Sequence, residues 1–287
     1  IIDQVTRSGA STCGTEIVYR VGVTRVSAQV RELDPATGQF SEQATFVLGG
    51  EGDVPAAYST RRAEPDTRYR IALAEGVTSW QITEALKAMD LLSGEVAEVP
   101  GEGTLAPDSY EVVPGDSRAS VLAEMQERQE LRLAAAWESR EEGLPFDSPE
   151  ELLIFASIVE KETGQAEERP QVASVFVNRL NRGMRLQTDP TVIYGVTKGK
   201  GVLGRGLRRS ELRGVTPWNT YVIEGLPPTP IANPGRASLE AAANPAETDF
   251  IFFVADGTGG HAFAETLQEH NRNVAKWREI ERQQKNN

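Results

Sequence analysis

The sequence contains little of the chemistry that disulfides, metal sites and thiol catalysis require. Its 287 residues include one cysteine, Cys13, and only two histidines. One cysteine excludes a disulfide within the chain, and this set leaves little for a transition-metal site or for Cys–His catalysis. No Gly-rich phosphate loop, Ser-His-Asp arrangement or nicotinamide fingerprint is present either. We therefore expect neither a metal nor a cofactor.

Long apolar runs are also missing. The longest, at residues 152–159, is far too short to cross a bilayer. Ile1 begins the chain without the charged n-region of a signal peptide, which leaves open what precedes it. The formal net charge of −12 argues against a non-specific nucleic-acid binder and favours a well-solvated surface.

The overall composition is that of an ordinary globular protein. Charged residues make up 25% and hydrophobic residues 39% of a chain long enough for two domains. Strand-like segments and one amphipathic helix, with Trp80, Ile82 and Leu86 on its apolar face, fill residues 1–114. Within this part, residues 91–114 form a Gly/Pro-rich connector.

Helical patterns dominate residues 115–287. We expect helices at about 116–141, 148–162, 167–182 and 266–284, and a β-hairpin at 250–264. The fold class that this pattern predicts is α+β, with a β-rich first region and an α-rich mixed second domain.

The most informative of these segments is the helix at 148–162. Ser148 suits the N-cap and Pro149 the first helical position, and an almost entirely apolar stretch follows. Its last turn nevertheless carries Glu160 and Glu162 beside the negative end of the helix dipole. A local rule that is broken so plainly often marks a functional site.

Helical geometry separates the two glutamates. Glu162 shares its face with Phe155, Ile158 and Val159, so burial of that face would desolvate its carboxyl group. Burial and the dipole both raise a carboxyl pKa, and a general acid for glycosidic cleavage needs that property. The alternative is a solvated helix end in which Glu160, Lys161 and Glu162 pair locally.

Two loop regions are dense in hydrogen-bonding side chains. In the first, Gln187, Thr188 and Asp189 could bind hydroxyl and acetamido groups of a sugar, or could cap a turn. In the second, Asn219 and Tyr221 precede several prolines, which suits either the wall of a groove or structural turns.

Two further features keep alternatives open. His261 and Phe263 follow a glycine-rich turn and could contact a sugar, although packed residues of these types are more common. Six basic side chains lie in residues 198–213. Their setting in an acidic chain without interleaved aromatic residues favours an exposed loop, or contact with an anionic polymer, over nucleic acid.

Six segments together resemble the YceG-like endolytic murein transglycosylases. They are residues 156–163, 172–180, 183–195, 218–221, 225–228 and 253–261. The resemblance covers about Pro145 to the C-terminus, and the run from Met184 to Tyr194 is long and specific. Residues 75–82 also resemble the strand-to-helix turn of a LysM-like module.

The resemblance implies a bacterial inner-membrane enzyme whose catalytic domain faces the periplasm, held by a single anchor helix that this chain lacks. Its substrate would be nascent peptidoglycan glycan strands, and cell-wall synthases (penicillin-binding proteins) are possible partners. It also implies a LysM-like region within residues 1–114 and the catalytic domain within 115–287. We assign Glu162 as the catalytic residue. The substrate-binding candidates are Gln187, Thr188, Asp189, Tyr194, Asn219, Tyr221, His261 and Phe263.

One carboxyl group is enough for the implied reaction. Protonated Glu162 would donate to the oxygen between N-acetylmuramic acid (MurNAc) and N-acetylglucosamine (GlcNAc). The resulting carboxylate would then deprotonate the muramic C6 hydroxyl, which closes on C1 to leave a 1,6-anhydro end. The alternatives are a muramidase that uses Asp189 as its second carboxylate, and a non-catalytic peptidoglycan-binding scaffold.

Overall fold

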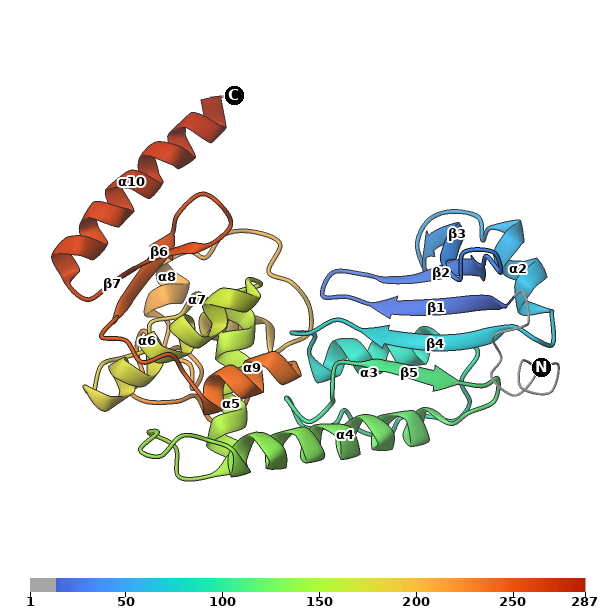
Figure 1. Ribbon diagram of the computed structural model, residues 1–287, viewed down its shortest axis with the longest axis horizontal. Helices are drawn as coiled ribbons and strands as arrows, with labels where there is room; N and C mark the ends of the chain where they lie inside the picture. The colour runs from blue at the N-terminus through green and yellow to red at the C-terminus, as the bar shows by residue number, and fades with distance from the viewer. Residues whose placement is uncertain (1–13, 287) are drawn as a thin grey trace.

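The computed structural model describes residues 14–286 and has an α+β fold, as the sequence predicts (Figure 1). The features expected at Ile1 and Cys13 lie outside the described residues. A five-stranded sheet forms one lobe and a group of helices with a two-stranded hairpin forms the other.

The sheet lobe is a mixed sheet with the strand order β3-β2-β1-β4-β5. Its central pair, β1 and β4, is parallel, and the remaining neighbours are antiparallel. Its elements are β1 (Thr15–Val21), β2 (Val26–Leu33), β3 (Phe40–Val47), α2 (Ala56–Arg62), β4 (Arg68–Leu73), α3 (Ser79–Ala88) and β5 (Ser109–Val112). Ile17 and Ile71 from the sheet and Leu86 from α3 are fully buried in one hydrophobic core.

Two elements of this lobe differ from the prediction. The connector expected at 91–114 contains β5, whose pairing with β4 completes the sheet edge. The prediction missed it because only Tyr110 and Val112 of its four residues are buried, and prolines flank the segment. The short helix α2 was not predicted either, because the glycines before Pro55 indicate only a loop.

The helical lobe is built around α5. Its elements are α4 (Arg118–Glu138), α5 (Pro149–Glu162), the 3-10 turn η1 (Ala166–Glu168), α6 (Arg169–Asn181), α7 (Asp189–Thr197), α8 (Arg209–Arg213), α9 (Arg236–Ala243), β6 (Phe252–Ala255), β7 (His261–Ala264) and α10 (Leu267–Asn286). Helix α5 contacts α4, α6, α7 and α9, which explains its almost entirely apolar composition. Ser148 is its N-cap as expected, since its side chain accepts a hydrogen bond from the Glu151 amide at 3.2 Å.

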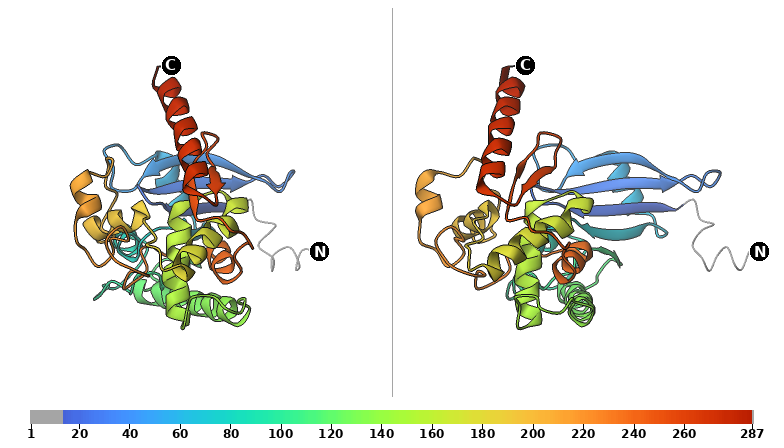
Figure 2. Two further views of the ribbon diagram at one scale, coloured as in Figure 1. Left: turned by 90° about the vertical axis from the view of Figure 1, so that its left-hand side faces the viewer. Right: turned by 60° about the vertical axis from the view of Figure 1, so that its left-hand side comes forward.

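Helix α10 packs on the β6–β7 hairpin through its first part and then projects away from the rest of the molecule (Figure 2). No helix within residues 14–286 is both long and apolar enough to cross a membrane.

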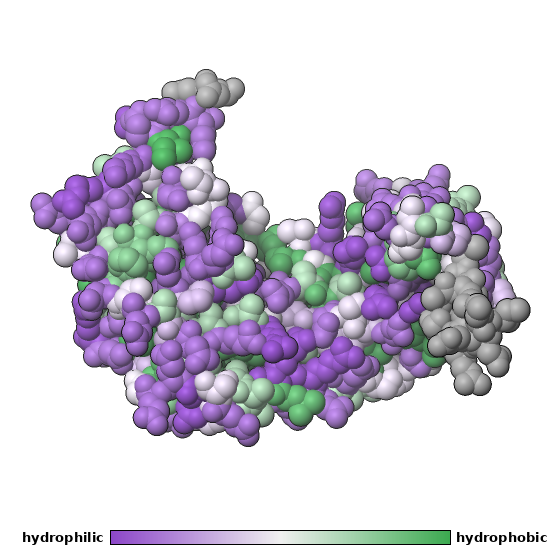
Figure 3. Space-filling view, viewed as in Figure 1, coloured by the Kyte–Doolittle hydropathy of each residue, from purple (hydrophilic) through white to green (hydrophobic). Residues whose placement is uncertain are grey.

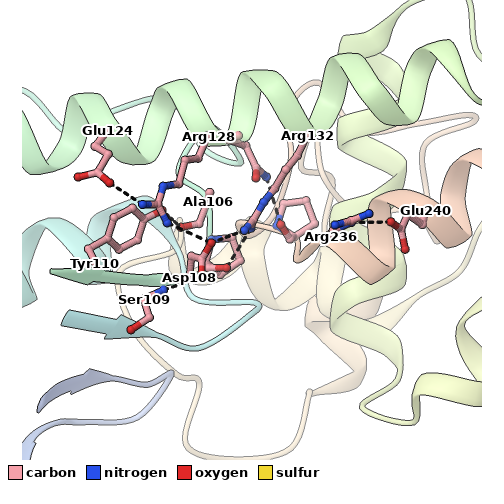
Figure 4. Close-up of polar contacts among 12 residues, drawn as sticks. Ala106, Asp108, Ser109, Tyr110, Glu124, Arg128, Arg132, Arg236 and Glu240 are labelled. Atoms are coloured by element: carbon pink, nitrogen blue, oxygen red, sulfur yellow. Dashed lines mark hydrogen bonds and ion pairs between the residues drawn. The ribbon is translucent and has the colours of Figure 1, made fainter. Parts of the chain in front are cut away.

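Helix α4 connects the two lobes and contributes side chains to the hydrophobic core of each. Val121 and Met125 in its first half belong to the core of the sheet lobe, whereas Ala136 belongs to the core of the helical lobe. On its exposed side, Arg128 and Arg132 both bind Asp108, which lies just before β5 (Figure 4). The division at residue 114 and the LysM-like character of the first region stay predictions.

A second attachment joins the lobes near the start of α3. The buried Asn233 side chain accepts from the Leu105 amide at 2.9 Å and donates to the Val77 carbonyl at 2.9 Å. The Thr78 hydroxyl donates to the Gly199 carbonyl at 2.6 Å. One face of the molecule is hollowed between the lobes, and hydrophobic residues gather on the floor of that hollow (Figure 3).

Candidate active site

The last turn of α5 carries three successive side chains with three separate partners. Glu160 accepts hydrogen bonds from the Gly235 amide at 3.0 Å and the Ser238 hydroxyl at 2.7 Å. Both donors belong to the start of α9, so the positive end of the α9 dipole faces this carboxylate. Lys161 donates to the Gly76 carbonyl at 3.1 Å. The local pairing of these three residues that we considered as an alternative does not occur.

Glu162 is the carboxyl group of this turn that α9 does not bind, so it is the candidate for proton transfer. Phe155, Ile158 and Val159 on its face are fully buried, as expected, and the Glu162 side chain is itself partly buried. Desolvation raises the pKa of Glu162, and the negative charge of Asp189 raises it further. The Thr188 hydroxyl donates to Oε1 of Glu162 and opposes this rise. The net rise favours the protonated form that a general acid needs.

The loop that carries Thr188 is held in place by Thr220. The Gln187 amide donates to the Thr220 carbonyl and the Thr188 amide to the Thr220 hydroxyl, both at 3.1 Å. Gln187 adopts a positive φ of 50°, which is uncommon outside glycine and often marks a functional site. Thr188 occupies the N-cap position of α7 but gives its hydroxyl to Glu162 instead of capping the helix. We expected residues 183–191 to form a loop throughout, and α7 already begins at Asp189.

Asp189 and Tyr221 form a second polar pair beside Glu162. The Tyr221 hydroxyl donates to Oδ1 of Asp189 at 2.7 Å. Burial raises the pKa of the Tyr221 hydroxyl, which therefore stays protonated and remains a donor. The Asp189 side chain is exposed, so a substrate can reach it.

The β6–β7 hairpin contributes His261 and Phe263. Glu168 accepts from both the backbone amide and Nδ1 of His261, each at 2.8 Å. A side chain at Gly260 would collide with Glu168, because a Cβ there would lie 2.4 Å from Oε1. A positive charge on His261 would lower the pKa of Glu162. Phe263 is partly buried against Phe253, with ring centroids 6.1 Å apart.

Sequence reasoning missed two residues that organise this site. Glu168 holds His261, and Arg179 donates to the Ile251 carbonyl at 2.7 Å and the Leu186 carbonyl at 2.6 Å. Arg179 thereby ties the hairpin to the loop of Thr188. A signal was available, because Arg179 lies on the otherwise apolar face of α6.

Two predicted site residues lie elsewhere or have other partners. The Tyr194 hydroxyl donates to Oε2 of Glu102 at 3.1 Å, in the contact between the lobes. The Asn219 side chain is buried, and its Nδ2 donates to the carbonyls of Glu211, Leu212 and Gly214. Asn219 thus fixes the end of α8. Neither residue forms a hydrogen bond with Glu162.

Known proteins resemble this chain over most of its length. The sequence model of the YceG-like family matches residues 23–276. A protein of Bacillus subtilis named endolytic murein transglycosylase is 38% identical over 178 residues, which are 62% of this chain and 48% of that protein. A Streptococcus pneumoniae protein of the same name is 33% identical over 181 residues, or 61% of this chain and 32% of its own length.

A solved structure supports the same grouping. The crystal structure of a YceG-like protein from Listeria monocytogenes has a TM-score of 0.60 and 31% identity, covering 71% of this chain and 75% of the other. The matched parts span only about half or a third of the two curated relatives. The family match, however, extends over most of the sequence. The chain therefore belongs to the YceG-like family.

Proposed function

We propose that the protein is a lytic transglycosylase that cuts peptidoglycan glycan strands internally. The bond cleaved is the β-1,4 bond between MurNAc and GlcNAc of nascent strands, and the product ends are 1,6-anhydro-MurNAc, so that cleavage terminates strand elongation. The names of the bacillar and streptococcal relatives support this class of activity. The observation that carries the proposal is Glu162: a partly buried carboxyl group with a raised pKa, hydrogen-bonded by a hydroxyl and without an ion pair to any described residue.

The chemistry needs one proton to leave Glu162 and one to return. Protonated Glu162 donates to the glycosidic oxygen as the bond from that oxygen to C1 of MurNAc breaks. Its carboxylate then takes the proton of the C6 hydroxyl, whose oxygen bonds to C1. No water is consumed, and the carboxyl group ends protonated as it began. Thr188 and Asp189 adjust the proton affinity of Glu162 in opposite directions throughout.

A second candidate is a muramidase that hydrolyses the same bond. The observation that favours it is Asp189, an exposed carboxylate whose charge acts on Glu162. In that reaction Asp189 would activate a water molecule or attack C1, as in two-carboxylate glycosidases. The product ends distinguish the two reactions, because hydrolysis adds one water and the lyase reaction adds none.

The test is to digest purified glycan strands and weigh the ends by mass spectrometry. We expect anhydro ends from the wild-type chain and a loss of rate of roughly 10²–10⁴-fold in Glu162→Gln, the usual contribution of a general acid. Glu167→Gln, on the exposed neighbouring turn, is the control and should cut normally. Activity that survives in Glu162→Gln would contradict the proposal. Binding to cell wall without any fragments would favour the non-catalytic scaffold.

The location and partners follow from this substrate. An enzyme that acts on peptidoglycan works on the cell-wall side of the membrane, and we propose that it is held at the inner membrane with its catalytic domain in the periplasm. Cell-wall synthases that make the strand are the expected partners. The LysM-like region within residues 1–114 belongs to the same proposal.

A further inference from the structure

A cavity of about 320 Å³ lies between the lobes, beside the turn that carries Glu162. Lys161 and Pro190, the chain neighbours of Glu162 and Asp189, belong to its lining. Thr78 and Gln81 line it from the sheet lobe, so both lobes contribute to one site. This volume lies within the range of small-ligand sites.

The chemistry of the lining suits an acyl or peptidyl group better than a sugar ring. Ile193, Val202, Leu203 and Ile231 give the cavity a mainly apolar surface. Methyl groups of amino-acid side chains would bury apolar area on this surface, and the polar side chains of the lining, such as Thr78 and Gln81, could bind peptide groups. None of the described residues that line the cavity is acidic.

Lys161 supplies a cationic group in this apolar setting. Its ammonium group has three donors, and among the described residues only the Gly76 carbonyl accepts from it. Burial lowers the pKa of Lys161, and an anion bound beside it would favour the charged form again. Two of its three donors therefore have no acceptor among the described residues.

The segment 201–204 adds unpaired backbone groups. The amides of Val202, Leu203 and Gly204 donate to no described residue, and their carbonyls accept from none. Backbone groups of this kind can form hydrogen bonds with the backbone of a bound peptide.

We propose that this cavity binds the carboxylate-bearing peptide arm of the peptidoglycan strand, with Lys161 on the carboxylate and residues 201–204 on the peptide backbone. The inference rests on the proposed function, because it assumes a peptide-bearing glycan at Glu162. Two or three extended peptide residues span roughly 7–11 Å, and the lining residue Lys161 is the chain neighbour of Glu162. The site would make the enzyme selective for strands that still carry peptides.

Binding is measured first, with the full chain carrying Glu162→Gln so that no substrate is cut. The probes are a MurNAc-containing disaccharide with its peptide, the same disaccharide without it, and the free peptide. We expect the peptide to tighten binding of the disaccharide by at least about tenfold, which corresponds to about 1.4 kcal/mol. Lys161→Met should reduce that advantage severalfold. Equal binding with and without the peptide would overturn the proposal.

A second variant leaves the hydrogen bond from Lys161 to the Gly76 carbonyl intact. Val202→Asp places a negative charge at the cavity on a side chain that is 53% exposed, so folding should not suffer. Its control is Val215→Asp, which is 84% exposed and outside the cavity lining. We expect the first to abolish the preference for the peptide and the second to keep it. Equal losses in both variants would contradict the assignment.

The two proposals fail in different ways. If peptide-dependent binding is present and the wild-type chain cuts no strand, the cavity assignment stands and the lyase assignment falls. If strands with and without peptides are bound and cut equally, the lyase assignment stands and the cavity assignment falls.

Discussion

Glu16 in the sheet lobe and Glu160 and Glu162 in the helical lobe are held by different kinds of partner. In the sheet lobe, Glu16 is 3% exposed and lies between Arg31 and Arg70, with its carboxylate 3.0 Å from the Arg70 guanidinium. In the helical lobe, Glu160 and Glu162 receive hydrogen bonds from hydroxyl groups, joined for Glu160 by a backbone amide, and neither forms an ion pair with a described residue.

The difference shows how one chain uses the same residue type for stability and for proton transfer. A guanidinium group can only donate, so it suits a carboxylate that stays charged. A hydroxyl group can donate to a carboxylate or accept from a carboxylic acid, so it tolerates both forms. The hydroxyl of Thr188 therefore suits Glu162, which would lose and regain a proton. Desolvation raises the pKa of Glu162. Variants at both kinds of site can test this distinction.

The largest effect on stability is expected at Glu16. Glu16→Gln removes the charge that two guanidinium groups share, and we expect a loss of about 2 kcal/mol in the free energy of unfolding. Breaking a fully buried ion pair costs about 3–5 kcal/mol, and the partly exposed arginines reduce that cost. Urea unfolding measures the change. Glu111→Gln, which removes an exposed partner of Arg68 and Arg70, is the control and should cost less than about 1 kcal/mol. Equal losses would contradict the contrast between the lobes.

The next effect is a pair of opposite shifts in the pH dependence of cleavage. Activity requires protonated Glu162 and falls as pH rises through its pKa. Thr188→Val removes a hydrogen bond that lowers this pKa, so the fall should move to higher pH. Asp189→Asn removes a charge that raises it, so the fall should move to lower pH.

Profiles of kcat/KM against pH measure both shifts. Glu167→Gln on the exposed turn η1 is the control and should leave the profile unchanged. Shifts in the same direction for Thr188→Val and Asp189→Asn would show that the pKa of Glu162 does not govern the rate. A muramidase would instead lose its activity at every pH in Asp189→Asn.

A smaller effect is expected where Glu160 meets α9. Ser238→Ala removes one of the two hydrogen bonds that Glu160 accepts, and we expect a loss of about 1 kcal/mol in the free energy of unfolding. Cleavage should be almost unchanged, because Glu162 keeps its own partner. A large loss of activity without a loss of stability would mean that Glu160 also takes part in the chemistry.

Local sequence patterns were enough to predict the longer helices and the candidate acid, whereas the short helices α2, α7, α8 and α9 were not predicted. The helix α5 and its cap follow from Ser148, Pro149 and the apolar stretch, and the buried face under Glu162 follows from helical periodicity. These features depend on neighbours within a few turns. The edge strand β5 depends instead on pairing with β4, far away in the sequence, and the pattern of its four residues is too short to reveal it.

The partners of the site residues could not be predicted in this way. The contact of Thr188 with Glu162 requires the loop path that Thr220 imposes, and the role of Glu160 requires α9, about 75 residues further along. Asn219 was expected to line a groove, and its amide instead holds α8. Polar side chains find partners only after the helices have packed, so residue type alone does not tell a substrate contact from a structural one.

The smallest effect is a gain in stability on removing the proposed acid. The pKa of Glu162 is raised in the folded chain, so ionised Glu162 favours unfolding, and this cost develops as pH rises through that pKa. The carboxamide of Glu162→Gln cannot ionise, so the variant does not have this cost. Its oxygen can still accept a hydrogen bond from Thr188. Its Tm should therefore exceed that of the wild-type chain at about pH 8, with the difference vanishing below the ordinary glutamate pKa of about 4.3. Thermal melts across this range measure the difference, with Glu167→Gln as the exposed control. A variant that is less stable at high pH would mean that the carboxylate stabilises the fold, as in the sheet lobe, and is not poised to carry a proton.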